Sequence, residues 1–166
     1  MKHLILLTIA GLVLSHCSKN KSRDINKVEF YLLKNYERVE GKCKVVEATV
    51  VLESQPLVSN ADIVEYSSSA YEFKLSELAI AKIKALDPRI PFALTVDKSI
   101  IYLGMHMPGF ISSTCDHSIT MTLSYDNPNK LQMRLGYPGI SPIAALEDRR
   151  NNPTFTAALA SQGKLK

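Results

Sequence analysis

The sequence predicts an α+β domain, in which a mostly antiparallel sheet of about six or seven strands has two helices packed on it. Several stretches alternate large apolar residues with small or polar ones at period two, as strands with one buried face do. Two other segments carry apolar residues at helical spacing behind a residue suited to capping a helix. Turn-forming residues at 97–98 and 126–129 join neighbouring strands directly, which favours antiparallel hairpins.

The composition is that of one globular domain. The chain has 166 residues, of which 46% are hydrophobic and 22% are charged. The formal charge of +4 is small, and the basic residues form no stripe, which argues against a nucleic-acid partner. The sequence shows no internal repeat and no glycine-rich phosphate loop, so neither a repeat fold nor a phosphate-loop nucleotide site is expected.

The first half of the domain is expected to supply three strands. Residues 28–33 alternate apolar side chains with period two, and residues 45–52 are rich in β-branched residues. Residues 59–63 have the composition of a single capped helical turn. Residues 70–75 then alternate cleanly and form the third expected strand.

The first helix is predicted at residues 77–86. Ser76 is a favourable capping residue, and Glu77 suits the positive end of the helix dipole. Apolar residues at helical spacing would pack on the sheet, and Pro88 would end the helix.

A hairpin is expected next. Residues 97–98 would form a two-residue turn between two strands. This turn places Leu94 opposite Ile101 and Phe92 opposite Leu103, which makes one face of the hairpin uniformly large and apolar.

The last part of the chain predicts two strands and a helix. Residues 118–125 alternate, with Ile119 and Tyr125 among the side chains on one face, and residues 131–135 return as the partner strand. Asn152 is expected to cap the final helix, with a proline at its first position and a glycine just after its end.

The amino terminus has the pattern of an export signal. A short basic start precedes an apolar run at residues 4–14, which is shorter than the roughly 20 residues that span a bilayer. The run ends in Leu14, Ser15, His16 and Cys17, which resembles the lipobox of bacterial lipoprotein precursors. His16 departs from the small residue that this family usually carries directly before the cysteine.

The resemblance implies a signal peptide at 1–16, a lipid-anchored tether at 17–26 and a globular domain at 27–166. Cys17 would be acylated and would bind membrane lipid, because each buried CH₂ of an acyl chain contributes about 0.8 kcal/mol. The protein would then lie in the bacterial cell envelope. Ser18 after the cysteine is similar to the pattern of outer-membrane lipoproteins that face the periplasm in Gram-negative bacteria.

Cys43 and Cys115 are the candidate disulfide pair. They are the two cysteines left if Cys17 is acylated, and exported proteins commonly form disulfides. The alternative is two free thiols.

The region between residues 106 and 117 holds the candidate ligand or metal residues. These residues lack the closely spaced ligand pairs of the familiar zinc signatures. Ser113 has no nucleophile elbow around it. No metal, cofactor or catalytic residue is therefore predicted, although four side chains stay candidates for ligand or metal binding: His106, Ser113, Asp116 and His117.

Part of the chain also resembles a region of the SecD export subunit in its order of elements. The order strand, helix, hairpin over residues 71–105 and the later helix end at 158–165 are similar to its periplasmic region. This resemblance implies a topology and carries no functional residues.

The first functional hypothesis is a non-enzymatic binding module that recognises an envelope protein or a glycan. The alternatives are a hydrolase or metal-dependent enzyme that uses residues 106–117, and a purely structural envelope protein.

Overall fold

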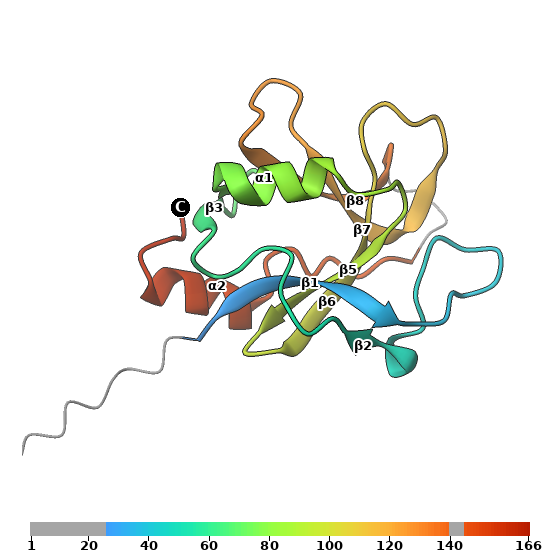
Figure 1. Cartoon of the computed structure of the whole chain (residues 1–166), viewed down its shortest axis with the longest axis horizontal. Coiled ribbons are helices and arrows are strands. Elements are labelled where there is room, and N and C mark those ends of the chain that lie inside the picture. Colours follow the sequence, from blue (N-terminus) through green and yellow to red (C-terminus); the bar gives the residue numbers. More distant parts are fainter. Residues whose placement is uncertain (1–25, 140–144) are drawn as a thin grey trace, which may run out of the picture.

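The computed structural model describes residues 26–139 and 145–166. Over these residues it confirms the α+β class, with one mostly antiparallel sheet and two helices (Figure 1). The sheet has eight strands, slightly more than predicted. The strands are β1 (Val28–Asn35), β2 (Val51–Leu52), β3 (Ile63–Ser67), β4 (Glu72–Leu75), β5 (Pro91–Val96), β6 (Ser99–His106), β7 (Cys115–Leu123) and β8 (Lys130–Tyr137), and the helices are α1 (Glu77–Lys84) and α2 (Pro153–Ser161).

The strands lie in the order β2-β1-β5-β6-β7-β8-β4-β3. Every neighbouring pair is antiparallel except β6 and β7, which run parallel. Residues 107–114 connect these two strands and return along the sheet from the end of β6 to the start of β7.

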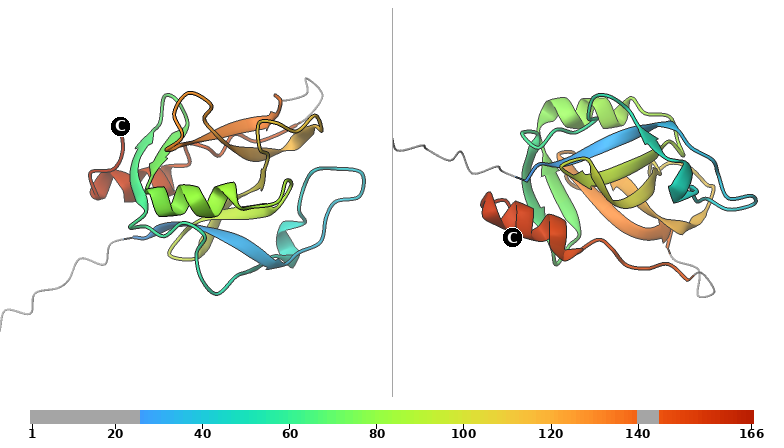
Figure 2. Two further views of the ribbon diagram at one scale, coloured as in Figure 1. Left: turned by 45° about the horizontal axis from the view of Figure 1, so that its top comes forward. Right: turned by 90° about the horizontal axis from the view of Figure 1, so that it is seen from below.

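The sheet curls until its two ends face each other (Figure 2). The rings of Phe30 in β1 and Phe73 in β4 have centroids 5.0 Å apart, although four strands separate β1 from β4 in the sheet. Both helices pack into the core that the curled sheet encloses, with Ile83 from α1 and Phe155 from α2 fully buried there. The apolar faces predicted for the helices are therefore confirmed.

A second, smaller core lies on the outer face of the sheet. Ala93 and Met105 of the central strands are buried there against Val45 and Met107, which come from loops. The loops on either side of these residues, 36–50 and 107–114, thus cover β5 and β6. This cover explains why all six residues of β5 are buried, whereas a strand with one solvent face would alternate.

Both predicted helix starts are confirmed. The Ser76 hydroxyl accepts a hydrogen bond from the Ala79 amide at 3.2 Å, and the Asn152 side chain accepts one from the Thr154 amide at 2.9 Å. Pro153 is the first residue of α2, as expected.

The hairpin has the predicted two-residue turn but a different register. Asp97 and Lys98 have φ values of 49° and 66°, as a tight hairpin turn requires. A bulge beyond Thr95 then places Phe92 opposite Gly104 and Leu94 opposite Tyr102, so the predicted pairing with Leu103 and Ile101 is wrong. The Phe92 ring packs directly on Gly104, where only a glycine leaves room for it.

Three other local predictions are wrong. Residues 45–52 form a 3-10 turn at Glu47–Thr49 followed by the short β2, because the Thr49 side chain bonds the Val46 carbonyl and bends the chain. Residues 59–63 form a hydrogen-bonded turn that leads into β3, an unpredicted strand, instead of a helical turn. Tyr125 lies beyond the end of β7 and is fully exposed.

Candidate functional site

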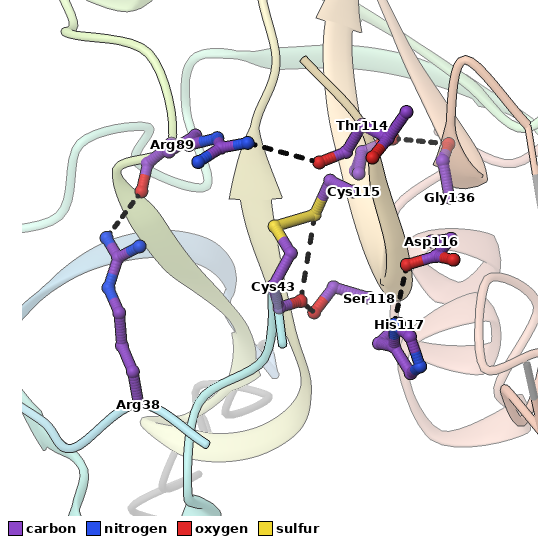
Figure 3. Close-up of a disulfide and its surroundings, with 10 residues drawn as sticks. Arg38, Cys43, Arg89, Thr114, Cys115, Asp116, His117, Ser118 and Gly136 are labelled. Carbon is purple, nitrogen blue, oxygen red and sulfur yellow. Dashed lines mark hydrogen bonds and ion pairs between the residues drawn. A yellow bond between two sulfur atoms is a disulfide. The ribbon is translucent and has the colours of Figure 1, made fainter. Parts of the chain in front are cut away.

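The structure contains the disulfide between Cys43 and Cys115 (Figure 3). The two Cα atoms are 5.1 Å apart, and 72 positions separate the cysteines in the sequence. Cys43 belongs to the loop after β1, and Cys115 is the first residue of β7 and is fully buried. The disulfide prediction is confirmed, and the bond ties a long surface loop to the start of a central strand.

Hydrogen bonds hold the same loop against the sheet. The Ser118 hydroxyl donates to the Cys43 carbonyl at 2.5 Å. The Arg38 guanidinium donates to the Arg89 carbonyl at 3.0 Å, and the Arg89 guanidinium donates to the Thr114 carbonyl at 3.3 Å (Figure 3). These contacts connect the loop, directly and through Arg89, to the C-terminal end of the region 106–117.

A cleft of about 380 Å³ opens beside this loop. One wall is formed by Val39 and residues 44–47 of the loop, and a second wall is formed by residues 145–147 and Arg149, which precede α2. Residues 102–105 of β6 and 117–119 of β7 form the floor. Small-molecule and cofactor sites have volumes in this range, from about 300 to 1,000 Å³.

The cleft lies where β6 and β7 separate. Their parallel ladder pairs Gly104, Met105 and His106 with Ile119, Thr120 and Met121. The earlier residues of the two strands, 99–103 and 115–118, are not paired with each other within the described chain.

The cleft carries both apolar and charged side chains. Leu103, Met105 and Ile119 are apolar floor residues. Lys44 and Glu47 add opposite charges to the loop wall. On the other wall the Arg149 guanidinium donates to Glu147 at 2.8 Å, and it also reaches the Ile101 carbonyl at 3.4 Å. The balance of charge suits a neutral or zwitterionic ligand better than a polyanion.

Tyr102 contributes a buried polar group beside the cleft. Only 3% of the residue is exposed, and burial raises the pKa of its phenol well above the usual value. Its hydroxyl is the one buried side-chain polar atom of the described residues that has no hydrogen-bond partner. The Tyr102 ring packs against Phe92 and Phe155 in the main core, so this unmade bond is a cost of the core and not a feature of the cleft.

The structure does not bring the two candidate histidines together. His106 pairs with Met121, which is four residues after His117 on the parallel strand. At about 3.3 Å per residue the two histidines are about 13 Å apart along the sheet. His106 is buried, its Nδ1 lies 3.1 Å from the Asp87 carbonyl oxygen, and burial lowers the pKa of its imidazole.

Of the other candidates, Asp116 and His117 contact each other, and Ser113 lies in a loop. His117 Nδ1 lies 2.5 Å from Asp116 Oδ1, and both side chains are partly exposed. His117 lines the cleft, whereas Ser113 lies in the 107–114 loop and bonds neither histidine within the described chain. In the described ranges no group of three or more His, Cys, Asp or Glu side chains could hold a metal ion.

Sequence reasoning missed the cleft and most of its residues. Its walls come from parts of the chain that are far apart, and the loop wall carries no motif. Of the predicted candidates, His117 lines the cleft. The charged residues 148–150 contribute Arg149 to its wall, and the neighbouring Asp148 pairs with Arg150 at 2.7 Å. The Arg150 guanidinium also lies 3.7 Å from the centre of the Tyr71 ring, so it attaches this segment to the start of β4.

Cys17 and the rest of the predicted signal lie outside the described residues. Among the residues that are described, no helix has the length and apolar character needed to cross a membrane. No model of a known protein family, no curated protein and no solved structure matches this chain.

Proposed function

We propose that this protein is an exported, lipid-anchored module of the bacterial cell envelope that binds a partner without chemical conversion, through the cleft beside β6 and β7. The disulfide between Cys43 and Cys115 is the observation that carries the proposal. Stable disulfides belong to oxidising compartments outside the cytosol, so the bond supports export independently of the signal sequence.

The disulfide also bears on Cys17. The sequence has three cysteines, and the two in the folded domain bond to each other. The pairing of Cys43 with Cys115 leaves Cys17 for the acylated position of the lipobox pattern. Residues 18–27 would span at most about 36 Å between the anchor and β1, since an extended chain advances about 3.3–3.6 Å per residue.

The cleft supports a binding function more than an enzymatic one. Its loop wall is fixed by the disulfide and by the Ser118 hydrogen bond, and preformed walls suit recognition. The enzyme hypothesis needs His106, Ser113 and His117 to act together, and the described geometry keeps the two histidines apart. The partner would be an envelope protein or a glycan.

Metabolic labelling with a fatty acid tests the anchor. Wild-type protein should incorporate the label and sediment with membranes, and Cys17→Ser should lose both properties. Cys43→Ser serves as a matched control, because it removes a cysteine of the same chain without touching the signal. Equal labelling of wild type and Cys17→Ser would contradict the anchor.

A photo-crosslinking residue tests the cleft. Placed at Ala145 on the cleft wall, it should form a discrete adduct in cells, whereas the same residue at Ala157 on the exposed face of α2 should not. Indistinguishable adduct patterns from the two sites would contradict binding at the cleft.

A further inference from the structure

We propose that His117 is the residue through which the cleft binds its ligand, and that it receives an uncharged group with an apolar body and a hydroxyl or N–H donor. The inference rests on the proposed function, since it names the ligand chemistry of the same cleft. Three features of the structure carry it: a bulge in β7, the contact of His117 with Asp116, and the apolar lining of the cleft.

A bulge in β7 places His117 in the cleft. The bridges that Cys115 and Ile119 make to β8 are four residues apart on β7 but only two residues apart on β8. The additional residues of β7 therefore lie within 116–118. Bulges of this kind redirect side chains and are frequent beside functional sites. Here the bulge allows the consecutive residues His117 and Ser118 both to line the cleft.

Covalent and hydrogen bonds hold both ends of the bulge. Cys115 precedes it and is bonded to Cys43, and Ser118 at its end donates to the Cys43 carbonyl at 2.5 Å. Cys115 and Ser118 are buried, whereas the side chains of Asp116 and His117 between them are 36% and 34% exposed. The pair is thus presented to the ligand on a fixed backbone, as a preorganised binding residue requires.

Asp116 determines which nitrogen of the imidazole is available to a ligand. His117 Nδ1 lies 2.5 Å from Asp116 Oδ1 (Figure 3). A carboxylate only accepts hydrogen bonds, so Nδ1 carries the proton of the neutral ring and Nε2 keeps a lone pair. Figure 3 shows Nε2 on the side of the ring that points away from Asp116. Among the described residues none bonds Nε2, so this nitrogen can accept a hydrogen bond from a ligand.

The rest of the lining determines what body the ligand group has. The Ser118 hydroxyl is already bonded to Cys43, and Arg149 is already held by Glu147 and the Ile101 carbonyl. The polar groups beside His117 are therefore engaged, and the charges of the cleft balance. Three segments of the chain contribute partly exposed apolar side chains to the lining: Val39, Val46, Leu103 and Leu146. An uncharged apolar body fits this lining, with its donor on Nε2.

Matched pairs of small probes test the hydrogen bond. δ-Valerolactam and its N-methyl derivative differ in one N–H donor, and cyclopentanol and its methyl ether differ in one O–H donor. Titrations of nitrogen-15-labelled full-length protein in detergent follow the His117 Nε2 signal and the Leu103 amide signal. Each donor should bind about three- to tenfold more tightly than its methylated partner, the ratio that one neutral hydrogen bond supplies. The Nε2 signal should shift with the donors only.

Three variants assign the effect to the pair. His117→Phe keeps a flat ring and removes the acceptor, so both members of each probe pair should bind equally. Ser113→Ala is the control, because Ser113 does not line the cleft, and it should keep the wild-type ratio. Equal thermal unfolding of the variants establishes that the fold is intact. Asp116→Asn keeps the imidazole if His117→Phe fails to fold; its Nδ1 and Nε2 signals should move toward each other as the second tautomer becomes populated, and the donor preference should weaken.

The outcomes separate this proposal from the proposed function. Equal affinity of donors and methylated partners for wild type overturns the role of His117, as does a donor preference that survives His117→Phe or a lack of binding by all four probes. A discrete adduct at Ala145 together with any of these results would keep the cleft as a binding site. A donor preference that His117→Phe removes, without an adduct at Ala145, would keep the ligand chemistry and remove the envelope partner.

Discussion

Gly104 sits at a position in β6 that has no room for a side chain. A Cβ atom built there would lie 2.4 Å from the Phe92 ring and 2.6 Å from the Ile119 carbonyl oxygen. The same glycine is the first β6 residue to pair with β7 and a floor residue of the cleft. Its missing side chain therefore permits both the central aromatic packing and the junction of the two strands.

Gly104→Ala should lower the free energy of unfolding by about 1–3 kcal/mol, because the added methyl group forces the ring or the strand to shift. Urea denaturation measures the change. Gly109→Ala is the control, since the nearest atom to its Cβ is a Thr122 methyl carbon at 3.9 Å, and it should change stability by less than about 0.5 kcal/mol. Equal effects of the two substitutions would contradict the steric account.

His106 should make stability depend on pH. Burial lowers its pKa in the folded protein, whereas an unfolded histidine titrates near 6.5. As the pH falls below about 6.5, the unfolded chain takes up the proton first, so the free energy of unfolding decreases, by at most about 1.4 kcal/mol per pH unit. The loss ends once the pH is below the folded pKa.

His106→Gln isolates this contribution. The free energy of unfolding of wild type minus that of the variant should shrink as the pH falls from 7.5 to 5, because only wild type carries the penalty of protonating a buried imidazole. Urea titrations across this range measure it. A difference that stays constant with pH would show that His106 takes up its proton equally in both states.

At the scale of elements, the disulfide adds a covalent link between a loop and a strand that otherwise meet through hydrogen bonds and through the packing of Val45. Cys43→Ala with Cys115→Ala should lower the free energy of unfolding by roughly 2–5 kcal/mol, since the bond closes a long loop in the unfolded chain. Denaturation of the oxidised protein and the double variant measures the loss. Reducing agent should destabilise wild type and leave the variant unchanged.

Hydrogen exchange shows which part of the domain loses protection when the disulfide is removed. Amides of residues 37–46 should exchange faster in the double variant, because only the Ser118 and Arg38 hydrogen bonds and the packing of Val45 then connect this loop to the sheet. Amides of β3 and β4, which are remote from the bond, should change only as far as global stability changes. Uniform acceleration in both regions would show that the bond does not hold the loop specifically.

The elements that the sequence predicts well are those whose signals are local. α1 and α2 follow from Ser76, from Asn152 and from apolar residues at helical spacing. The β-branched run at 45–52 wrongly predicts one continuous strand. The Cys43–Cys115 disulfide and the Thr49 hydrogen bond instead hold this part of the chain in a loop that packs on the outer face of the sheet. β3 escapes prediction because it depends on distant partners, among them Leu165 at the end of the described chain.

The candidate site was predictable only in part for a related reason. Two cysteines in the domain of a chain that is predicted to be exported indicate a disulfide from sequence alone. The cleft depends on where β6 and β7 separate, on the bulge that shifts the hairpin register and on the position of residues 145–149. Each of these is set by contacts between segments that are far apart, which no local pattern encodes.

At the scale of the whole molecule, one aromatic cluster joins the two ends of the curled sheet. Phe73 of β4 lies 5.0 Å from Phe30 of β1 and 4.3 Å from Tyr66 of β3, measured between ring centroids. Phe73→Ala should therefore lower the free energy of unfolding by about 3–5 kcal/mol and keep a single transition for the whole domain. Coincident circular dichroism and tyrosine fluorescence curves measure it, and two separated transitions would show that the sheet ends fold independently.

The contact between Lys27 and the hairpin turn has a mechanical consequence for a tethered protein. The Lys27 amide donates to the Asp97 side chain at 2.8 Å, and the Asp97 amide donates to the Lys27 carbonyl at 2.9 Å. If Cys17 is the anchor, a pulling force from the membrane reaches the domain first at these two hydrogen bonds between Lys27 and Asp97. The force is then transmitted along β1. β1 is bonded on both sides, to β5 and to β2 with Val58, so the pull shears several hydrogen bonds together instead of opening them one by one.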